Sequence, residues 1–324
     1  MSTTDSAVLP RIPVGEWFEA GFDWVRASFD AVFDAISTGV RAVVDGLGGV
    51  LLLPEPVIGV LVFALIGFVV RSWRFALLSA LALGLVVSMD MWEPAMQTLA
   101  LVLFATLIAV VIAVPVGILA ARSDTVSAVV KPVLDFMQTM PAFVYLVPTV
   151  MLFSIGVVPG VISTIVFALP PGVRLTELGI RGVDRETVEA GQAFGSSPGQ
   201  ILRGIQLPLA LPTIMAGVNQ VIMLSLSMAV IAGLVGAGGL GQLVVTSISR
   251  LDIGLGFEAG LAVVVLAIYL DRITAAIGNP DASRGSLRQL MATRRSRTSQ
   301  AAADADPATE DADHDAVPAR SGTA

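Results

Sequence analysis

The chain has 324 residues, of which 55% are hydrophobic and only 14% are charged, with a formal net charge of −7. Soluble domains carry roughly 25% charged residues, so this composition excludes an ordinary soluble domain and indicates a protein embedded in lipid. The absence of cysteine excludes disulfides, thiolate metal sites and cysteine nucleophiles. Six acidic residues fall within 304–315, so the net charge says nothing about acidic partners.

Residues 1–49 predict an amphipathic segment outside the membrane core rather than a cleavable signal peptide, because acidic and basic residues interrupt the first 40 positions. Apolar residues recur there at intervals of three and four, as on one face of a helix. They are Trp17, Phe18, Phe22, Val25, Phe29, Phe33 and Ile36. A helix of this kind is expected to lie in the membrane interface.

Seven later segments approach or meet the length of about 20 apolar residues that a membrane-spanning helix needs. They cover approximately residues 54–70, 75–87, 94–121, 133–155, 160–175, 211–235 and 257–270. The first two are short, and Arg71, Trp73 and Arg74 between them are residue types that anchor helix ends at the interface. The sequence therefore predicts an all-α polytopic membrane protein with about seven transmembrane helices, in a domain covering residues 50–278.

Prolines concentrate in the third, fourth and fifth of these segments, at Pro115, Pro141, Pro148, Pro170 and Pro171. Proline frees backbone carbonyls, which is tolerated at membrane depth where a helix packs on protein or lines a cavity. The cluster therefore favours a cavity near these segments. Ordinary kinks in packed helices remain the alternative, since proline is common in such helices.

Charged residues interrupt the pattern between 179 and 209, which predicts a solvent-exposed loop of about 30 residues. Asp184 suits an N-cap, and Gly195 suits the left-handed residue that ends a helix. Pro198 fits the first turn of a second helix, which Leu207-Pro208 is expected to stop. Both predicted helices present apolar surface, so either a soluble partner covers them or the loop folds back on its own spans.

The glycine-rich stretch Gly236-Ala-Gly-Gly-Leu-Gly241 matches a dinucleotide-binding pattern letter by letter but follows a membrane helix rather than a strand. A sharp, closely packed turn is the better interpretation. After position 279 the chain is polar, which predicts a disordered tail, and its single histidine, His314, is expected to be solvated there. No cofactor, metal ion or nucleic acid is expected.

Positive charges predict the orientation, because Lys and Arg accumulate on the cytoplasmic side. With the N-terminus outside and seven spans, 15 of the 19 Lys and Arg residues lie inside and 4 lie outside. The 179–209 loop and the tail at 279–324 are therefore expected in the cytoplasm of a bacterial cell, below its inner membrane.

The loop contains Glu-Ala-Gly-Gln-Ala-Phe-Gly at 189–195 and Ile-Gln-Leu-Pro at 205–208. This spacing resembles the signature loop of permease subunits of ATP-binding-cassette importers, where the resemblance implies a coupling helix seated in a separate ATPase subunit. Gly191 departs from the alanine usual in that family. The coupling residues implied are Glu189, Ala190, Gly191, Gly195, Ile205, Leu207 and Pro208.

Further segments resemble the glycine betaine/proline, or quaternary ammonium, branch of that family. They are residues 137–148, 167–171, 216–220, 236–241 and 270–274. The resemblance implies a type I importer permease core that works as a homodimer in membrane lipid, with an ATPase and an extracytoplasmic substrate-binding protein. It implies glycine betaine, choline, proline or carnitine as substrate, and it implies no enzyme activity in this chain.

Five polar residues embedded in apolar sequence are candidates for lining the pathway: Gln138, Thr139, Tyr145, Asn219 and Gln220. Hydrogen bonding between packed helices is the equal alternative for each of them.

Two rival functions stay open at this point. A permease of another importer branch, for an amino acid such as methionine, would share the loop signature. A secondary carrier would place ionisable groups at the bilayer midplane, whereas the middles of these spans hold Gln, Asn, Ser and Thr. The chain carries no G-x-x-x-x-G-K-[ST] phosphate loop, so ATP hydrolysis would have to come from a partner.

Overall fold

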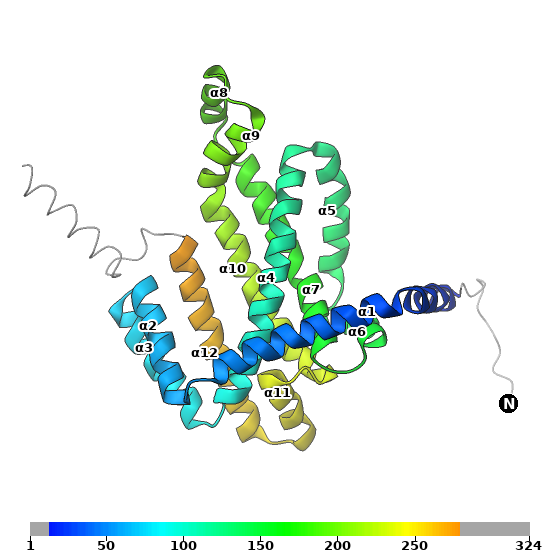
Figure 1. The fold of residues 1–324 in the computed structure, drawn as a ribbon, viewed down its shortest axis with the longest axis vertical. Coiled ribbons are helices and arrows are strands. Elements are labelled where there is room, and N and C mark those ends of the chain that lie inside the picture. Colours follow the sequence, from blue (N-terminus) through cyan, green and yellow to red (C-terminus); the bar gives the residue numbers. More distant parts are fainter. Residues whose placement is uncertain (1–12, 279–324) are drawn as a thin grey trace, which may run out of the picture.

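The computed structural model describes residues 13–278, and this part of the chain is helical throughout, without a β-strand. Figure 1 shows a bundle with one projecting helical hairpin loop. The elements in chain order are α1 (Val14–Leu52), α2 (Pro56–Val70), α3 (Trp73–Ser88), α4 (Trp92–Arg122), α5 (Asp124–Thr139), η1 (Ala142–Tyr145), α6 (Leu146–Phe153), α7 (Val157–Arg181), α8 (Arg185–Ala193), α9 (Pro198–Ile201), η2 (Leu202–Gln206), α10 (Leu207–Ile231), η3 (Ala232–Val235), α11 (Gly239–Arg250) and α12 (Ile253–Gly278).

The centre of the bundle consists of α4, α7 and α10, which pack on one another. Small residues allow the close approach, because a Cβ added to Gly172 would lie 2.9 Å from the Cβ of Ala113, and one added to Gly117 would lie 2.6 Å from the Cβ of Thr176. Helices in membranes use such residues because lipid supplies no hydrophobic force between helices, leaving close packing to hold them together.

Five helices of the described part are long and apolar enough to cross a membrane, or six if one bent pair forms a single span. Helices α2 and α3 are apolar but shorter, with 15 and 16 residues. Each of the seven predicted segments contains helix, which confirms the all-α membrane class while leaving the number of spans approximate.

The fourth predicted span, 133–155, is not one straight helix. Helix α5 ends at Thr139, and the following pair η1 and α6 turns away from it by 107°. Met140 is extended, with ψ of 133°, because the ring of Pro141 disfavours helical backbone in the residue before it. The proline was expected to lie inside the span, but it separates two helices.

The N-terminal segment forms one helix, α1, with a non-helical residue at Phe29. Although its composition meets the criterion for a span, α1 runs across the bundle in Figure 1 rather than alongside α4 and α10. Its C-terminal half packs on the bundle through Val40 and Val44, whereas Trp17 is 66% exposed. The expected boundary between residues 49 and 50 therefore lies inside a helix.

The predicted 30-residue loop is shorter than expected, because the neighbouring helices extend into it. Helix α7 continues to Arg181, and α9, η2 and α10 follow one another without a break. Leu207-Pro208 therefore does not stop the second loop helix. The π-turn η2 precedes Pro208, and such local widening accommodates a proline within a continuous helix.

At the other end of α10, the glycine-rich stretch forms the predicted tight turn before α11, a helix that the sequence did not signal. Gly236 and Gly238 have φ of +74° and +82°. Side chains of α4 cap the first turn of α11, since Thr98 Oγ1 accepts from the Leu240 N–H at 2.8 Å and Gln97 Oε1 from the Gly239 N–H at 3.1 Å.

Candidate functional site

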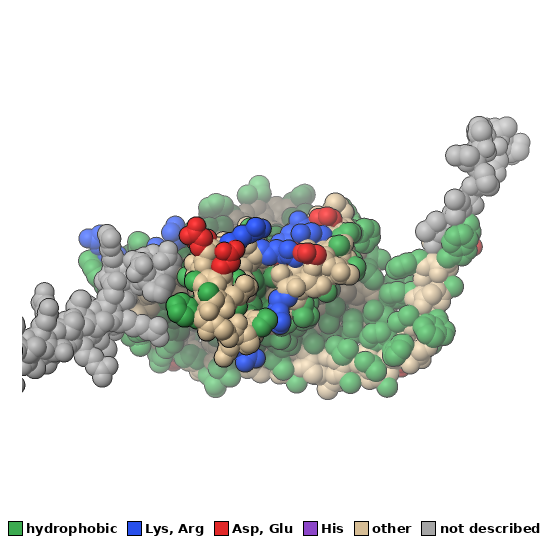
Figure 2. All heavy atoms as spheres, turned by 90° about the horizontal axis from the view of Figure 1, so that it is seen from above, with side chains coloured by type: hydrophobic (Ala, Val, Ile, Leu, Met, Phe, Trp, Pro, Cys, Tyr) green, Lys and Arg blue, Asp and Glu red, His purple; other side chains and the backbone are tan. Residues whose placement is uncertain are grey.

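The segment from α8 to η2 projects beyond the ends of α4 and α5 at one end of the bundle (Figure 1). It contains five of the seven residues predicted to couple the chain to a partner, and the other two, Leu207 and Pro208, follow it directly as the first residues of α10. Figure 2 views this end and shows acidic and basic side chains gathered on it, surrounded by hydrophobic ones. The segment therefore lies at the charged end of the bundle.

Helix α8 begins and ends as the sequence predicts. The Asp184 carboxylate accepts from the Glu186 N–H at 3.1 Å, which caps the first turn. At the other end Gly195 has φ of +79°, and the Ser196 and Gly195 N–H groups donate to the carbonyls of Gly191 and Gln192. These two bonds form a Schellman motif, so the bend is fixed by backbone alone.

Helix α9 restarts the chain with a capping box. The Ser197 N–H donates to Gln200 Oε1 at 2.7 Å, and Pro198 occupies the first turn, where its missing N–H leaves no bond unmade. The two predicted loop helices are thus confirmed, and the second is the first turn of the long helical run to Val235.

Gly191, which stands where the family usually has alanine, has a packing role that the sequence alone did not reveal. It is buried, and a Cβ added to it would lie 2.6 Å from the Cδ1 of Ile205 and 3.6 Å from the Cγ1 of Ile201. Glycine at this position therefore lets α8 lie close to the helical run at the base of α10. Ile205, which was predicted from the motif, lies against α8 at this point.

Leu207 belongs to a small apolar cluster beneath the loop, which is separate from the main core of the bundle. Its buried members are Ile180, Leu202, Ala210 and Ile214, with Val183 and Leu207 packed against them. Pro208 is exposed on the outside of the same turn. The cluster attaches the loop to α7 and α10 together.

The outer face of α8 remains open. Phe194 is 90% exposed at the tip, and Glu189 and Ala190 are exposed along the helix. Glu189 also lines a groove of about 640 Å³ with Arg181, Arg185, Gln192 and Gln206. An exposed aromatic ring beside charged groups is the composition of a protein contact surface.

An ionic cluster that the sequence did not predict lies at the base of the loop. Glu177 of α7 is only 5% exposed and accepts from Ser127 Oγ at 2.7 Å. Its carboxylate pairs with Arg181 at 3.1 Å and with Lys131 at 3.4 Å, which joins α5 to α7. The i, i+4 spacing of Glu177 and Arg181 in the sequence indicates that these two side chains can pair on one helix. The sequence does not indicate that Glu177 is buried.

Arg181 extends the cluster to a third helix. Its guanidinium donates to the Ala120 carbonyl at 2.8 Å and pairs with Asp124 at 2.7 Å. Two turns further into the bundle along α7, Arg174 pairs with Asp135. The ends of α4, α5 and α7 are therefore tied together directly beneath α8.

The five predicted pathway residues fall into two groups. Gln138, Thr139 and Gln220 are exposed on α5 and α10. Asn219 instead donates to Asp271 at 2.8 Å and accepts from Thr274 at 2.6 Å, which joins α10 to α12. Tyr145 is buried, and its hydroxyl donates to the Met137 carbonyl.

Residues 113–279 match the family model described as "Binding-protein-dependent transport system inner membrane component". The chain is 49% identical over 278 residues to the glycine betaine/proline betaine transport system permease protein ProW of Escherichia coli (strain K12), covering 86% of this chain and 78% of that protein. It is 45% identical to the glycine betaine transport system permease protein OpuAB of Bacillus subtilis (strain 168), covering 86% and 99%.

The fold is also similar to a solved structure of the MetNI methionine ABC transporter in an inward facing conformation. That likeness has a TM-score of 0.53 at 24% identity and covers 58% of this chain and 94% of the other. At this identity it bears on the fold alone.

Proposed function

Because the chain belongs to the family of binding-protein-dependent transport system inner membrane components, we propose that it forms the translocation pathway of an ATP-driven importer for glycine betaine and related compatible solutes. The observation that carries this proposal is the 45–50% identity to glycine betaine permeases over most of the chain. The fold likeness to a methionine transporter does not favour methionine, since the identity there is 24%.

The partner that hydrolyses ATP binds the segment from α8 to η2 in this proposal. Three features support it: the segment projects from the bundle, Phe194 is 90% exposed, and the ionic cluster joins its base to α4, α5 and α7. Movement of the partner against α8 is thereby transmitted to three helices at once. Glu189, Ala190 and Gly195 form the outer contact, while Gly191, Ile205, Leu207 and Pro208 hold the loop on α10.

Two copies of the chain and an extracytoplasmic substrate-binding protein complete the importer. The pathway lies between the copies, where Gln138, Thr139 and Gln220 present uncharged polar groups to the solute. Asn219 and Tyr145 support the helices that line the pathway. Asn219 is hydrogen-bonded to α12, and Tyr145 is hydrogen-bonded to the end of α5. Uncharged groups suit a zwitterionic solute, which would be held too tightly by a fixed charge.

The loop faces the cytoplasm, and residues 1–49 lie outside, in agreement with the 15 to 4 distribution of basic residues. The cytoplasmic tail, 279–324, lies outside the described residues. Since the chain has no cysteine, Thr4→Cys and Ser299→Cys can be labelled without background. An impermeant maleimide should label the first and spare the second in cells stripped of any outer barrier, and the reverse result would invert the orientation.

Uptake by the reconstituted importer tests the substrate. The chain, its ATPase and its binding protein are placed in vesicles, and ATP-dependent uptake of glycine betaine, choline, proline and carnitine is compared. Glycine betaine should be taken up and should compete with the others that are accepted. Uptake of none of the four, with uptake of an amino acid such as methionine, would assign the chain to another importer branch.

A further inference from the structure

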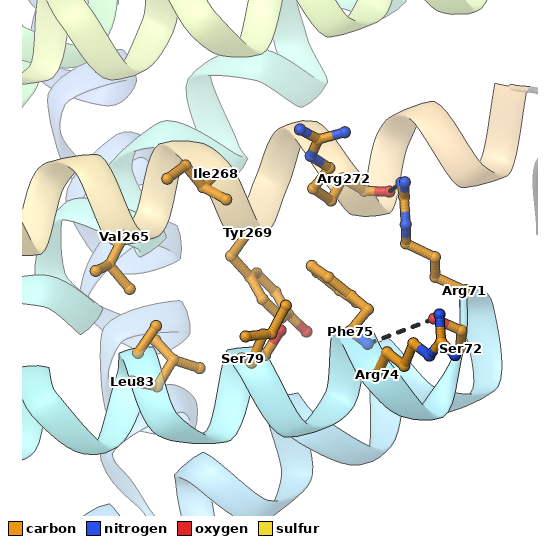
Figure 3. A pocket seen from close by; sticks show the side chains of 12 residues that line it. Arg71, Ser72, Arg74, Phe75, Ser79, Leu83, Val265, Ile268, Tyr269 and Arg272 are labelled. Atoms are coloured by element: carbon orange, nitrogen blue, oxygen red, sulfur yellow. Dashed lines mark hydrogen bonds between the residues drawn. The ribbon is translucent and has the colours of Figure 1, made fainter.

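A groove of about 480 Å³ separates the hairpin of α2 and α3 from α12, well away from the α8–η2 segment (Figure 3). It has a charged mouth and an apolar interior. The mouth residues are Arg71, Ser72, Arg74 and Arg272, and the interior is lined by Phe75, Leu78, Ser79, Ala82, Leu83, Val265, Ile268 and Tyr269. Leu78 and Ile268 in the lining are 64% and 54% exposed, so the groove is open along its apolar part.

Three guanidinium groups surround the mouth, and within residues 13–278 only one of them has an acidic partner. Arg272 lies 3.7 Å from Asp271, whose other carboxylate oxygen accepts from Asn219. Arg71 donates to the Arg272 carbonyl at 3.2 Å and lies over the Phe75 ring. A guanidinium has five N–H donors, so most donors at the mouth are left for a ligand. The mouth therefore carries the charge and the free donors that suit an anion.

The interior contains two polar side chains, Ser79 and Tyr269, and the hydroxyl of Tyr269, the larger of them, is bonded to the backbone of α2. The Tyr269 hydroxyl donates to the Phe63 carbonyl at 2.9 Å, so its ring stacks on Phe75 at 5.9 Å and forms part of the wall. The lining runs along α3 from position 74 to 83, which is about 14 Å at 1.5 Å per residue. That length and apolar lining match an acyl chain.

The depth of the mouth agrees with a lipid headgroup. The turn between α2 and α3 lies at the same end of the bundle as the last turn of α12, which is also the end that carries the α8–η2 segment (Figure 1). Trp73, in that turn, is 58% exposed, and Trp is enriched where membrane meets water. The arginines thus lie at headgroup level, with the apolar lining extending from them toward the bilayer interior.

We propose that this groove binds one anionic phospholipid, with the phosphate at Arg71, Arg74 and Arg272 and an acyl chain along α3 and α12. A soluble anion would use the mouth but none of the apolar lining, and a zwitterionic lipid would bring an ammonium group to three arginines. Basic pockets between transmembrane helices favour anionic headgroups for this reason. The site is separate from the coupling loop, so it stands whether or not the proposed substrate is right.

Native mass spectrometry of the full-length chain, purified from membranes in a mild detergent, tests the site. The probes are phosphatidylglycerol and phosphatidylcholine with identical acyl chains, titrated separately. One phosphatidylglycerol should bind at least about tenfold more tightly than phosphatidylcholine, since each interfacial arginine contributes about fivefold in affinity. Equal retention of the two lipids would overturn the proposal.

Variants locate the binding. The triple change Arg71→Gln, Arg74→Gln and Arg272→Gln should abolish the preference, whereas Arg122→Gln, an arginine at the end of α4, should keep it. Ala82→Phe leaves all three arginines and fills the apolar lining, so it should also weaken phosphatidylglycerol binding even if the triple variant unfolds. Unchanged preference in Ala82→Phe, or displacement of the lipid by excess glycerol phosphate, would rule out an acyl-chain site.

Discussion

Gly195 and Gly233 lie near bends at opposite ends of the bundle, and a side chain would meet different surroundings at each (Figure 1). At Gly195 an added Cβ would have no atom within 4 Å, and only the φ of +79° demands glycine. At Gly233 an added Cβ would lie 2.3 Å from the carbonyl carbon and oxygen of Gly241. One bend is restricted by its own backbone and has open space around it, while the other is restricted by packing.

This difference distinguishes the two bends by role. The bend at Gly195 leaves space for a partner, whereas the bend at Gly233 is filled by packing within the bundle. The Gly233 turn is closely surrounded by the bundle, since a Cβ added to Gly239 or Gly241 would also lie within 3 Å of a neighbouring atom. The loop at Gly195 touches nothing outside itself at its tip. Substitutions at the two ends should therefore have different consequences. A substitution at Gly233 should impair folding, and a substitution at Gly195 should impair coupling to the partner.

The largest effect is expected from Gly233→Ala. The new methyl group would overlap backbone atoms that no rotamer change can move, at a cost of about 3 kcal/mol or more. The yield of monodisperse protein on size-exclusion chromatography and its thermal unfolding temperature should both fall. Gly260→Ala is the matched control, because nothing lies within 4 Å of a Cβ there and alanine favours the helix. Equal stability of Gly233→Ala and Gly260→Ala would contradict the conclusion that packing restricts the bend at Gly233.

Gly195→Val should leave the protein folded in the membrane and impair coupling. A β-branched residue at φ of +79° is strained by about 1–3 kcal/mol, which re-aims α9 relative to α8. Pull-down of the ATPase and substrate-stimulated hydrolysis in vesicles should fall about tenfold. Gly195→Asn, which tolerates the left-handed region, should retain most of both. Normal coupling in Gly195→Val would refute the assignment of this loop as the ATPase contact.

Glu177→Gln tests whether the base of the loop must be rigid. The change leaves Arg181 and Lys131 without their shared carboxylate, and because both cations are partly exposed the loss should be about 1–2 kcal/mol rather than the larger cost of a fully buried pair. A lower unfolding temperature and weaker stimulation of hydrolysis should appear together. Asp135→Asn, which removes an exposed partner of Arg174, should change stability less.

A smaller effect is expected from Glu189→Ala. Glu189 is exposed and has no hydrogen-bond or ion-pair partner within the described residues, so its removal should leave stability within about 0.5 kcal/mol. ATPase association should weaken mildly if its carboxylate contacts the partner. Identical association in Glu189→Ala and the native chain would assign this residue to a solvated face.

Deleting residues 300–324 should have the least effect, since their Ala, Asp, Pro and Thr composition predicts no packed core. Uptake should stay close to that of the native chain at equal membrane levels. Complete loss of uptake would show that residues 300–324 take part in transport. The tail would then be a third region, besides the two bends, on which transport depends.

The helix ends of the loop could be predicted from the sequence because they depend on residues close together in the chain. Features that depend on tertiary packing could not be predicted. Asp184, Gly195 and Pro198 act within one or two turns of their own helices, so the cap, the bend and the restart could be predicted. The burial of Glu177 depends on α5, which is distant in sequence. Pro208 resembled a stop signal because a π-turn that accommodates proline leaves no mark in the local sequence.

The π-turn at Leu202–Gln206 also holds one residue more than the same stretch of α-helix would. The Leu207 N–H donates to the Leu202 carbonyl, an i→i+5 bond, so the five residues of this turn rotate the chain about as far as four residues of an α-helix. Deleting one residue from this turn should therefore leave α8 and Phe194 pointing in nearly the same direction. The same deletion in the α-helical part of α10 would rotate them about its axis by about 100°.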